Sequence, residues 1–214
     1  MGELILVDKP YGWSSFTVVE WVKRHFRVRK AGHAGTLDPL ATGLLLVATD
    51  EATREIPIYQ GWSKEYYALV ILGYRSLSDD AEYPPEKGAD PRPLSLGERR
   101  DLLERFIGCI LQRPPVFSAV KVKGQRAYML ARQGQLPLLF PRPVEIHDIE
   151  EVHYEAPYRW LLRIECGKGV YIRALARDIG EATGWGAYLG ALRRTRIGTH
   201  LVSKALQPDG YLLQ

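Results

Sequence analysis

The chain has 214 residues, of which 46% are hydrophobic and 25% charged, which is typical of one large globular domain or two small ones. No stretch approaches the roughly 20 apolar residues that span a membrane, and no basic segment precedes an apolar run at the N-terminus, so we expect a cytoplasmic protein. The net charge of +4 and the pI of about 9.0 favour a polyanionic partner.

The N-terminal residues predict a buried strand followed by an amphipathic helix. Residues 4–7 form a short apolar run of the kind that forms a buried strand. Ser14 or Ser15 can cap a helix that continues to about Phe26. One face of this helix is apolar and carries Val18, Val19, Val22 and Phe26.

The next segment predicts a loop between strands. Residues 31–42 have no hydrophobic periodicity, so we expect a long loop there. Residues 44–48 predict a second buried strand. Residues 66–72 alternate in polarity and predict a strand, which places Tyr66 and Tyr67 on opposite faces, one in the core and one free to line a pocket.

The middle of the chain predicts a surface segment and two helices. Residues 75–93 are rich in Pro, Asp and Glu, and we expect a mobile surface segment. Ser95 and Glu98 form a capping box that starts a helix. A further short helix is expected to end at Gly134.

The last third of the chain predicts strands around one strongly amphipathic helix. Residues 144–149, 160–166 and 191–198 predict strands, and the chain then ends in a short tail. Residues 172–182 predict a helix that Gly184 closes. Strands and helices are mixed without a regular βαβ rhythm, so the predicted class is α+β with a mixed sheet.

Cysteine and histidine residues give no sign of a disulfide framework or a metal site. The chain has two cysteines, Cys109 and Cys166, which we expect to be reduced, buried thiols. Its five histidines are scattered, and no Cys or His pair has the spacing of zinc ligands, so no metal is expected.

Basic residues gather in two clusters, each of which could be a solvated face or an RNA contact. The first comprises Lys23, Arg24, His25, Arg27, Arg29 and Lys30, and the second comprises Arg193, Arg194 and Arg196. Each cluster lies beside a motif described below, which favours contact with RNA phosphates.

The segment 32–43 surrounds one carboxylate, Asp38, with three glycines, a proline and two threonines. Pro39 disfavours the helical conformation at Asp38, so the backbone there is irregular. Two interpretations are open from these residues. Asp38 could cap its own loop in an Asx-turn, or the loop could hold its carboxylate for function.

This loop resembles the catalytic motif of the TruB-type pseudouridine synthases, which modify uridine 55 of tRNA. Other segments resemble further motifs of that family in the same order along nearly the whole chain. They are Asp8-Lys9-Pro10 with Gly12 and Ser14-Ser15, Lys64-Glu65-Tyr66, Gln112-Arg113-Pro114-Pro115 with residues 117–121 and Gly124, Cys166-Gly167-Lys168-Gly169 with Tyr171-Ile172-Arg173 and Asp178, and Leu192-Arg193-Arg194-Thr195-Arg196. Ordered motifs of this number are far more specific than any one of them.

The resemblance implies catalytic roles for three residues. Asp38 resembles the nucleophilic aspartate, which attacks the sugar at C1′ or helps to expel the base, and no cofactor is needed. Arg173 is expected to pair with Asp38 and keep it ionised, although from the sequence alone an exposed helix arginine or a phosphate contact fits equally well. Tyr66 would stack on the target uracil, and its hydroxyl could take part in proton transfer.

The resemblance also implies an RNA surface that holds a flipped uridine of the tRNA T-arm. His33 resembles an RNA-contacting histidine, whereas Lys9 and Lys168 could bind phosphate or order a loop. The other expected substrate or RNA contacts are Lys64, Tyr171, Leu192, Arg24 and Arg193.

For the whole chain, the resemblance implies a pseudouridine synthase fold with a largely antiparallel central sheet flanked by helices. The family usually carries a C-terminal PUA domain, but this sequence stops at Gln214, so residues 1–214 are expected to form one catalytic domain that acts as a monomer without an obligatory protein partner. The segment after Gly73 and the position of Pro57 depart from the family pattern. The alternatives are a non-catalytic RNA-binding or tRNA-folding module and a synthase directed by a guide RNA.

Overall fold

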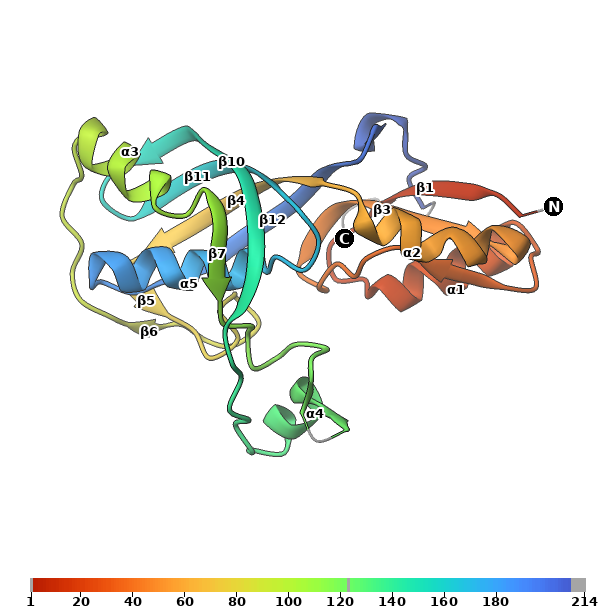
Figure 1. The fold of residues 1–214 in the computed structure, drawn as a ribbon, viewed down its shortest axis with the longest axis horizontal. Helices are drawn as coiled ribbons and strands as arrows, with labels where there is room; N and C mark the ends of the chain where they lie inside the picture. Colours follow the sequence, from red (N-terminus) through yellow and green to blue (C-terminus); the bar gives the residue numbers. More distant parts are fainter. Residues whose placement is uncertain (1, 123, 209–214) are drawn as a thin grey trace. The chain divides into compact units, whose positions relative to one another are not determined.

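The computed structural model describes residues 2–122 and 124–208 (Figure 1). The described residues divide into two compact units, one within residues 1–67 and 192–214 and the other within residues 68–191. Strands β4 (Lys64–Leu72) and β12 (Ala187–Ile197) contribute residues to both units.

The first unit is built on strands in the order β1-β3-β12-β4, with β2 paired to β3 and β13 paired to β12. Strand β1 is antiparallel to β3, whereas β12 is parallel to it. Besides β4 and β12, its elements are β1 (Leu4–Lys9), α1 (Ser15–His25), β2 (Ala31–His33), β3 (Ala41–Thr49), the 3-10 helix η1 (Asp50–Glu55), α2 (Ile56–Gly61), β13 (His200–Leu201) and the 3-10 helix η2 (Val202–Lys204).

Helix α1 begins where the sequence predicts. The Ser14 hydroxyl accepts a hydrogen bond from the Thr17 N–H at 3.0 Å and so caps the helix. The valines of the apolar face are buried against β1 and β3 residues in the core. Phe26 does not join them: it is the C-cap residue and 37% exposed, so its assignment to the apolar face was wrong.

The expected loop over residues 31–42 is shorter than predicted. Ala31–His33 pairs with β3 as strand β2, and β3 itself begins at Ala41. The partner of β2 lies 14 to 18 residues further along the chain (Ala31 opposite Thr49, His33 opposite Val47), so local periodicity carries no signal for it. What remains of the loop is residues 34–40.

The second unit has strands in the order β12-β4-β11-β10-β7, and β10 is antiparallel to both β11 and β7. The α+β class with a mixed sheet is therefore confirmed. Besides β4 and β12, its elements are β5 (Tyr74–Arg75), β6 (Glu86–Lys87), α3 (Leu96–Glu104), β7 (Gly108–Gln112), β8 (Lys121–Val122), β9 (Gln125–Arg126), α4 (Ala127–Arg132), β10 (Arg142–Glu155), β11 (Arg159–Cys166) and α5 (Ile172–Thr183).

All three helices predicted in this unit are present, and the one expected to end at Gly134 is α4, which ends at Arg132. Ser95 and Glu98 form the capping box of α3, with both reciprocal hydrogen bonds present. Helix α5 ends at Gly184, which adopts φ of 79°, a left-handed conformation that costs glycine little.

Two expectations for the second unit are confirmed only in part. Within the supposed surface segment 75–93, Ser78, Asp79 and Asp80 are buried. Their side chains are polar, so composition alone places them outside, but hydrogen bonds and ion pairs within the unit compensate for their burial. Cys109 is exposed on β7, and only Cys166 is buried as expected. The end of the predicted C-terminal tail, residues 209–214, lies outside the described residues.

Gly43 provides a test of how β3 packs against β12. It has φ of 106°, and a Cβ added there would lie 2.2 Å from the carbonyl oxygen of Arg194. Backbone strain and overpacking each cost about 1–3 kcal/mol, so Gly43→Ala should lower the free energy of unfolding by about 2–5 kcal/mol. Gly97→Ala is the matched control, because Gly97 lies in α3 with no atom within 4 Å of the added Cβ. Chemical denaturation compares the two, and equal midpoints would contradict the packing at Gly43.

Candidate active site

The loop that carries Asp38 is fixed through its backbone. Ser15, on the first turn of α1, hydrogen-bonds both backbone groups of Leu37: its hydroxyl donates to the carbonyl oxygen at 3.0 Å and accepts from the N–H at 2.8 Å. The Gly12 N–H donates to the Pro39 carbonyl at 2.8 Å. The Asp38 side chain is therefore carried on a loop that is tied to α1 and to the turn after β1, and Asp38 itself is half-buried.

Lys9 is a buried cation that joins this turn to the loop. Its side chain has 0% exposure, and its ammonium donates to the carbonyl oxygens of Pro10 (3.0 Å), Trp13 (2.6 Å) and Pro39 (3.2 Å). Burial lowers the pKa of Lys9 to about 8; the Asp38 carboxylate opposes this shift and Arg194 adds to it. Of the two roles that the sequence left open for Lys9, loop ordering agrees with this geometry.

Arg194 is a second buried cation, on β12, and it contacts the loop before Asp38 and strand β3 after it. It is 1% exposed. Its guanidinium donates to the carbonyl oxygens of Gly35 at 3.0 Å and Thr36 at 3.4 Å before Asp38, and to that of Leu44 at 2.8 Å after it. The expected phosphate contact of the second basic cluster is therefore wrong for Arg194, because the side chain is inside the unit and its donors are used by backbone carbonyls.

Tyr66 lies against the same guanidinium. The Tyr66 side chain is buried, whereas Tyr67 points to the exposed face of β4. Arg194 Nη1 donates to Tyr66 Oη at 3.5 Å, and the Arg194 Cζ lies 5.9 Å from the centre of the Tyr66 ring. One buried cation thus contacts both the Asp38 loop and Tyr66.

His33 ends strand β2, immediately before the loop. Burial, with a further contribution from Arg194, holds the pKa of His33 below its ordinary value of 6.5, so the ring is neutral at pH 7. Its Nδ1 is buried without a hydrogen-bond partner among the described residues. A neutral ring can stack on a base or form a hydrogen bond, but it does not attract phosphate by charge.

The remaining first-unit candidates differ in how accessible they are. Lys64 is buried, and its ammonium donates to the carbonyls of Gln60 at 2.8 Å and Trp62 at 2.5 Å, so a direct RNA contact would require it to leave both. The side chain of Arg193 is 43% exposed and forms a two-pronged ion pair with Asp8, at 2.7 and 3.1 Å. Leu192 is half-buried where β12 pairs with β3, and Arg24 is exposed on α1.

Arg173 lies in the second unit, on the first turn of α5. The sequence left its role open among a pair with Asp38, an exposed helix arginine and a phosphate contact. Its exposed fraction is 5%, so the interpretation of Arg173 as an exposed helix arginine is wrong. Its guanidinium donates to the carbonyls of Ser78 at 2.9 Å and Phe117 at 3.0 Å, and its Nε lies 3.6 Å from an Asp80 carboxylate oxygen. Asp38 belongs to the first unit and Arg173 to the second, so their pairing stays a prediction.

Sequence reasoning missed the acidic residues beside Arg173. Asp79 pairs with Arg177 at 2.8 Å, one helical turn after Arg173. Burial raises the pKa of Asp79 to about 6, although Arg177 and Arg173 oppose the shift. The available signal was two arginines spaced i, i+4 on the helix together with the adjacent acids Asp79 and Asp80.

The other second-unit candidates lie around the turn before α5. Lys168 is exposed between Gly167 and Gly169, and Gly169 has φ of 82°. Gln112 holds Tyr171 by its backbone, accepting from the N–H at 2.8 Å and donating to the carbonyl at 3.1 Å. An exposed Lys168 is consistent with either of its two expected roles.

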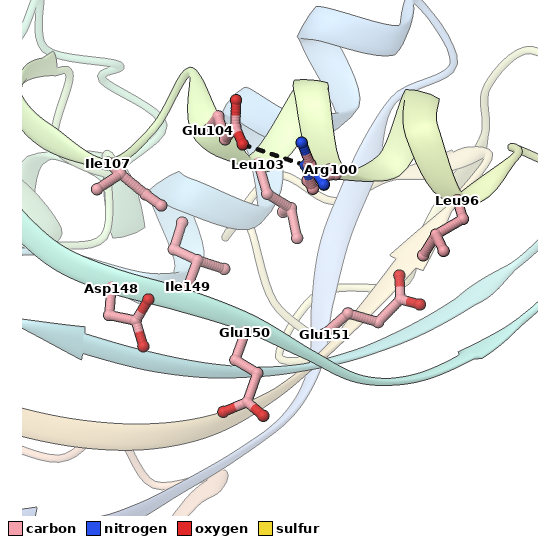
Figure 2. A pocket seen from close by; sticks show the side chains of 9 residues that line it. All are labelled: Leu96, Arg100, Leu103, Glu104, Ile107, Asp148, Ile149, Glu150 and Glu151. Atoms are coloured by element: carbon pink, nitrogen blue, oxygen red, sulfur yellow. Dashed lines mark ion pairs between the residues drawn. The ribbon is translucent and has the colours of Figure 1, made fainter.

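The second unit also has a pocket that contains none of the candidate residues. Figure 2 shows its side chains, which come from α3, from β10 and from Ile107 between α3 and β7, with Leu103 and Ile149 pointing toward one another. It encloses about 490 Å³, and four carboxylates line it: Glu104, Asp148, Glu150 and Glu151. Arg100 is the single basic residue in its lining and pairs with Glu104 at 3.4 Å. The other three carboxylates are paired too, Glu151 with Arg99 at 2.6 Å and both Asp148 and Glu150 with Arg163 at 2.7 Å. The lining therefore carries no positive excess that would attract RNA.

Within the described residues, no group of three or more His, Cys, Asp and Glu side chains is arranged to hold a metal ion. Over the same residues, no helix combines the length and apolar character that crossing a membrane requires.

Comparison with known proteins finds a family model and close relatives that match this chain. Residues 23–172 match the family model described as TruB family pseudouridylate synthase (N terminal domain). A tRNA pseudouridine synthase B of Rhodopseudomonas palustris is 45% identical over 194 residues, which cover 91% of this chain and 53% of that protein. A tRNA pseudouridine synthase B of Bacteroides fragilis is 44% identical over 213 residues, which cover 97% of this chain and 91% of that protein.

A solved structure agrees with the sequence relatives. A chain in the crystal structure of a Cbf5-Nop10-Gar1 complex superposes with a TM-score of 0.72 and is 31% identical, covering 95% of this chain and 51% of that chain. This chain thus spans about half the length of that protein and of the Rhodopseudomonas relative, and nine-tenths of the Bacteroides relative. The matched family model covers more than half of the sequence, and the chain belongs to the TruB family of pseudouridylate synthases.

Proposed function

We propose that this protein converts the T-loop uridine of tRNA to pseudouridine, with Asp38 as the nucleophile. The observation that carries the proposal is the loop 34–40. Two buried cations and Ser15 fix its backbone, while the Asp38 side chain at its centre is half-buried rather than enclosed. Holding a carboxylate in one geometry before the substrate arrives is what covalent catalysis requires.

The reaction exchanges one bond of the uridine for another. The N1–C1′ glycosidic bond breaks, the uracil rotates, and a C5–C1′ bond forms, with the C5 proton lost and N1 protonated, so no oxidant, reductant or cofactor is needed. Asp38 either attacks C1′ or assists departure of the uracil as an anion, and it is released when the C–C bond forms. Tyr66 stacks on the uracil, and its hydroxyl serves in proton transfer. Arg173, whose guanidinium is held by the carbonyl oxygens of Ser78 and Phe117, is the third catalytic residue of the proposal.

The relatives favour tRNA over other substrates. The proteins at 44–45% identity are named tRNA pseudouridine synthase B, whereas the Cbf5-Nop10-Gar1 structure is 31% identical. A synthase that acts on tRNA directly is therefore favoured over one directed by a guide RNA. A purely RNA-binding module is disfavoured because it has no need of a carboxylate held on an RNA-facing loop. We propose the T-arm as the binding element, with contacts from His33, Arg24, Lys168 and Arg193.

The proposal extends to the organisation of the protein. We propose that residues 1–214 act as one catalytic domain, as a monomer in the cytoplasm, and that no metal is required.

Asp38→Asn tests the nucleophile. The substitution keeps the size of the side chain and removes its charge and nucleophilicity, so pseudouridine formation on unmodified tRNA transcript should be abolished while tRNA affinity stays within about fivefold, ~1 kcal/mol. Mapping of pseudouridine by chemical adduct sequencing measures the product and its position. The matched control is Asp101→Asn on the exposed face of α3, which should react like the wild type. Full activity of Asp38→Asn would remove Asp38 from the mechanism, and a product outside the T-loop would remove the assigned substrate position.

Tyr66→Phe separates stacking from proton transfer. The ring is kept and the hydroxyl is lost, so single-turnover rates should fall at least about a hundredfold, ~2.7 kcal/mol, with near-normal tRNA affinity. Tyr67→Phe is the control, because Tyr67 is the next residue on β4 and faces the opposite, exposed side. A rate near that of the wild type for Tyr66→Phe would leave stacking as the only role of Tyr66.

A further inference from the structure

Helix α1 and the turn before it carry a groove in which Arg24 is the one residue given a role above. Its lining residues are Trp13, Thr17, Trp21, Arg24 and His25. Thr17, Trp21 and His25 follow one another at intervals of four, so they share one face of the helix. The groove encloses about 440 Å³ and lies wholly within the first unit.

The aromatic rings of this groove are held in place by the protein itself. Trp13 and Trp21 are half-buried and pack against the core cluster that contains Val18 and Val22. The Trp21 and His25 rings are stacked, with centroids 4.8 Å apart and planes 20° from parallel. Because these flat surfaces are ordered without a ligand, a planar ligand would lose little free energy in arranging them.

The charge around the groove is positive. Arg24 is exposed in its lining, and the residues that follow on the chain include the exposed Arg27, Arg29 and Lys30. Glu20 is the one acid in the α1 sequence, and it pairs with Lys23 at 3.0 Å. The lining of the pocket in the second unit, by contrast, has four acidic residues and one basic residue (Figure 2). The groove on α1 therefore suits an anion with a flat aromatic part.

We infer that this groove binds an unpaired nucleotide of the substrate RNA, with its base stacked on the indole and imidazole rings and its phosphate at Arg24. The inference rests on the proposed function, which supplies an RNA substrate. Stacking on aromatic side chains beside basic residues is how proteins hold single-stranded nucleic acid without reading its sequence. A base inside a duplex is already stacked on its neighbours, so the groove selects loop nucleotides over helical ones.

Indole resonances test the groove directly. The chain has five tryptophans, Trp13, Trp21, Trp62, Trp160 and Trp185, and each gives one indole N–H signal in a ¹⁵N-labelled sample. The Asp38→Asn protein is titrated with the single-stranded octamer rU8 and, separately, with a blunt RNA duplex of equal phosphate number. We expect rU8 to shift the Trp13 and Trp21 signals, assigned with Trp→Phe variants, and to leave the other three in place. The duplex should shift neither by a comparable amount.

Matched variants give the size of the effect. With the fluorescein-labelled T-arm stem-loop as probe, Trp21→Leu should weaken binding about 5- to 100-fold, the loss of roughly 1–3 kcal/mol of stacking, while Trp21→Phe should retain most of the affinity. Arg24→Gln should reduce the slope of log affinity against log salt by the amount expected for the loss of one phosphate contact. Arg100→Gln, in the pocket of the second unit, should leave the slope unchanged. His25→Leu, at an exposed position, repeats the test of stacking without touching the core.

The outcomes separate this inference from the proposed function. Shifts at Trp13 and Trp21 without pseudouridine formation by the wild-type protein would support nucleotide binding in the groove and contradict the proposed enzymatic function. Pseudouridine formation with no shift at either indole on saturation with rU8 would overturn the groove. Equal shifts with the duplex would also overturn it, since phosphate contact without stacking would then explain the binding.

Discussion

The guanidinium of Arg194 is buried, and its hydrogen bonds to Gly35, Thr36 and Leu44 hold the two sides of the Asp38 loop together. An enclosed charge is stable only when hydrogen-bond acceptors surround it, and the backbone carbonyls of an irregular loop are stable only when they find donors. Each therefore needs the other. Lys9 repeats this arrangement with the carbonyls of Pro10, Trp13 and Pro39, so the loop is ordered without being part of a helix or sheet.

This arrangement has electrostatic consequences at the site. The positive charge of Arg194 contributes to the lowered pKa of both Lys9 and His33, which favours a neutral imidazole beside the loop. A guanidinium can only donate hydrogen bonds, so the Tyr66 oxygen accepts from Arg194 in their contact. The same guanidinium thus orders the loop and contacts Tyr66.

Local sequence signals predicted the helices well, because caps and glycine ends act over a few residues. Ser14, the Ser95–Glu98 capping box and Gly184 all lie where the sequence placed them. Strand β2 was missed because its partner β3 is distant in sequence and its three residues show no alternation. No local pattern distinguishes an arginine that is buried by long-range contacts from one in a solvated cluster, which is why Arg194 was taken for a phosphate contact.

Candidate site residues could be nominated from the sequence, but their environment could not. The motif around Asp38 identified the loop, and order along the chain identified Tyr66 and Arg173. The burial of Arg173, and the role of Ser78 and Asp80 as its partners, depend on a segment whose composition resembles exposed chain. Polar residues that are buried in compensated networks escape composition-based reasoning, since their partners are remote in sequence.

Hydrogen–deuterium exchange on Arg194→Lys tests the central claim most directly. A lysine keeps the charge but presents a single nitrogen, which cannot reach carbonyls on both sides of the loop as the guanidinium does. Peptides that cover residues 34–44 should exchange at least about tenfold faster than in the wild type, ~1.4 kcal/mol of lost local stability, while peptides of α3 in the second unit stay unchanged. Unchanged exchange in residues 34–44 would contradict the account, because the loop would then be ordered without Arg194.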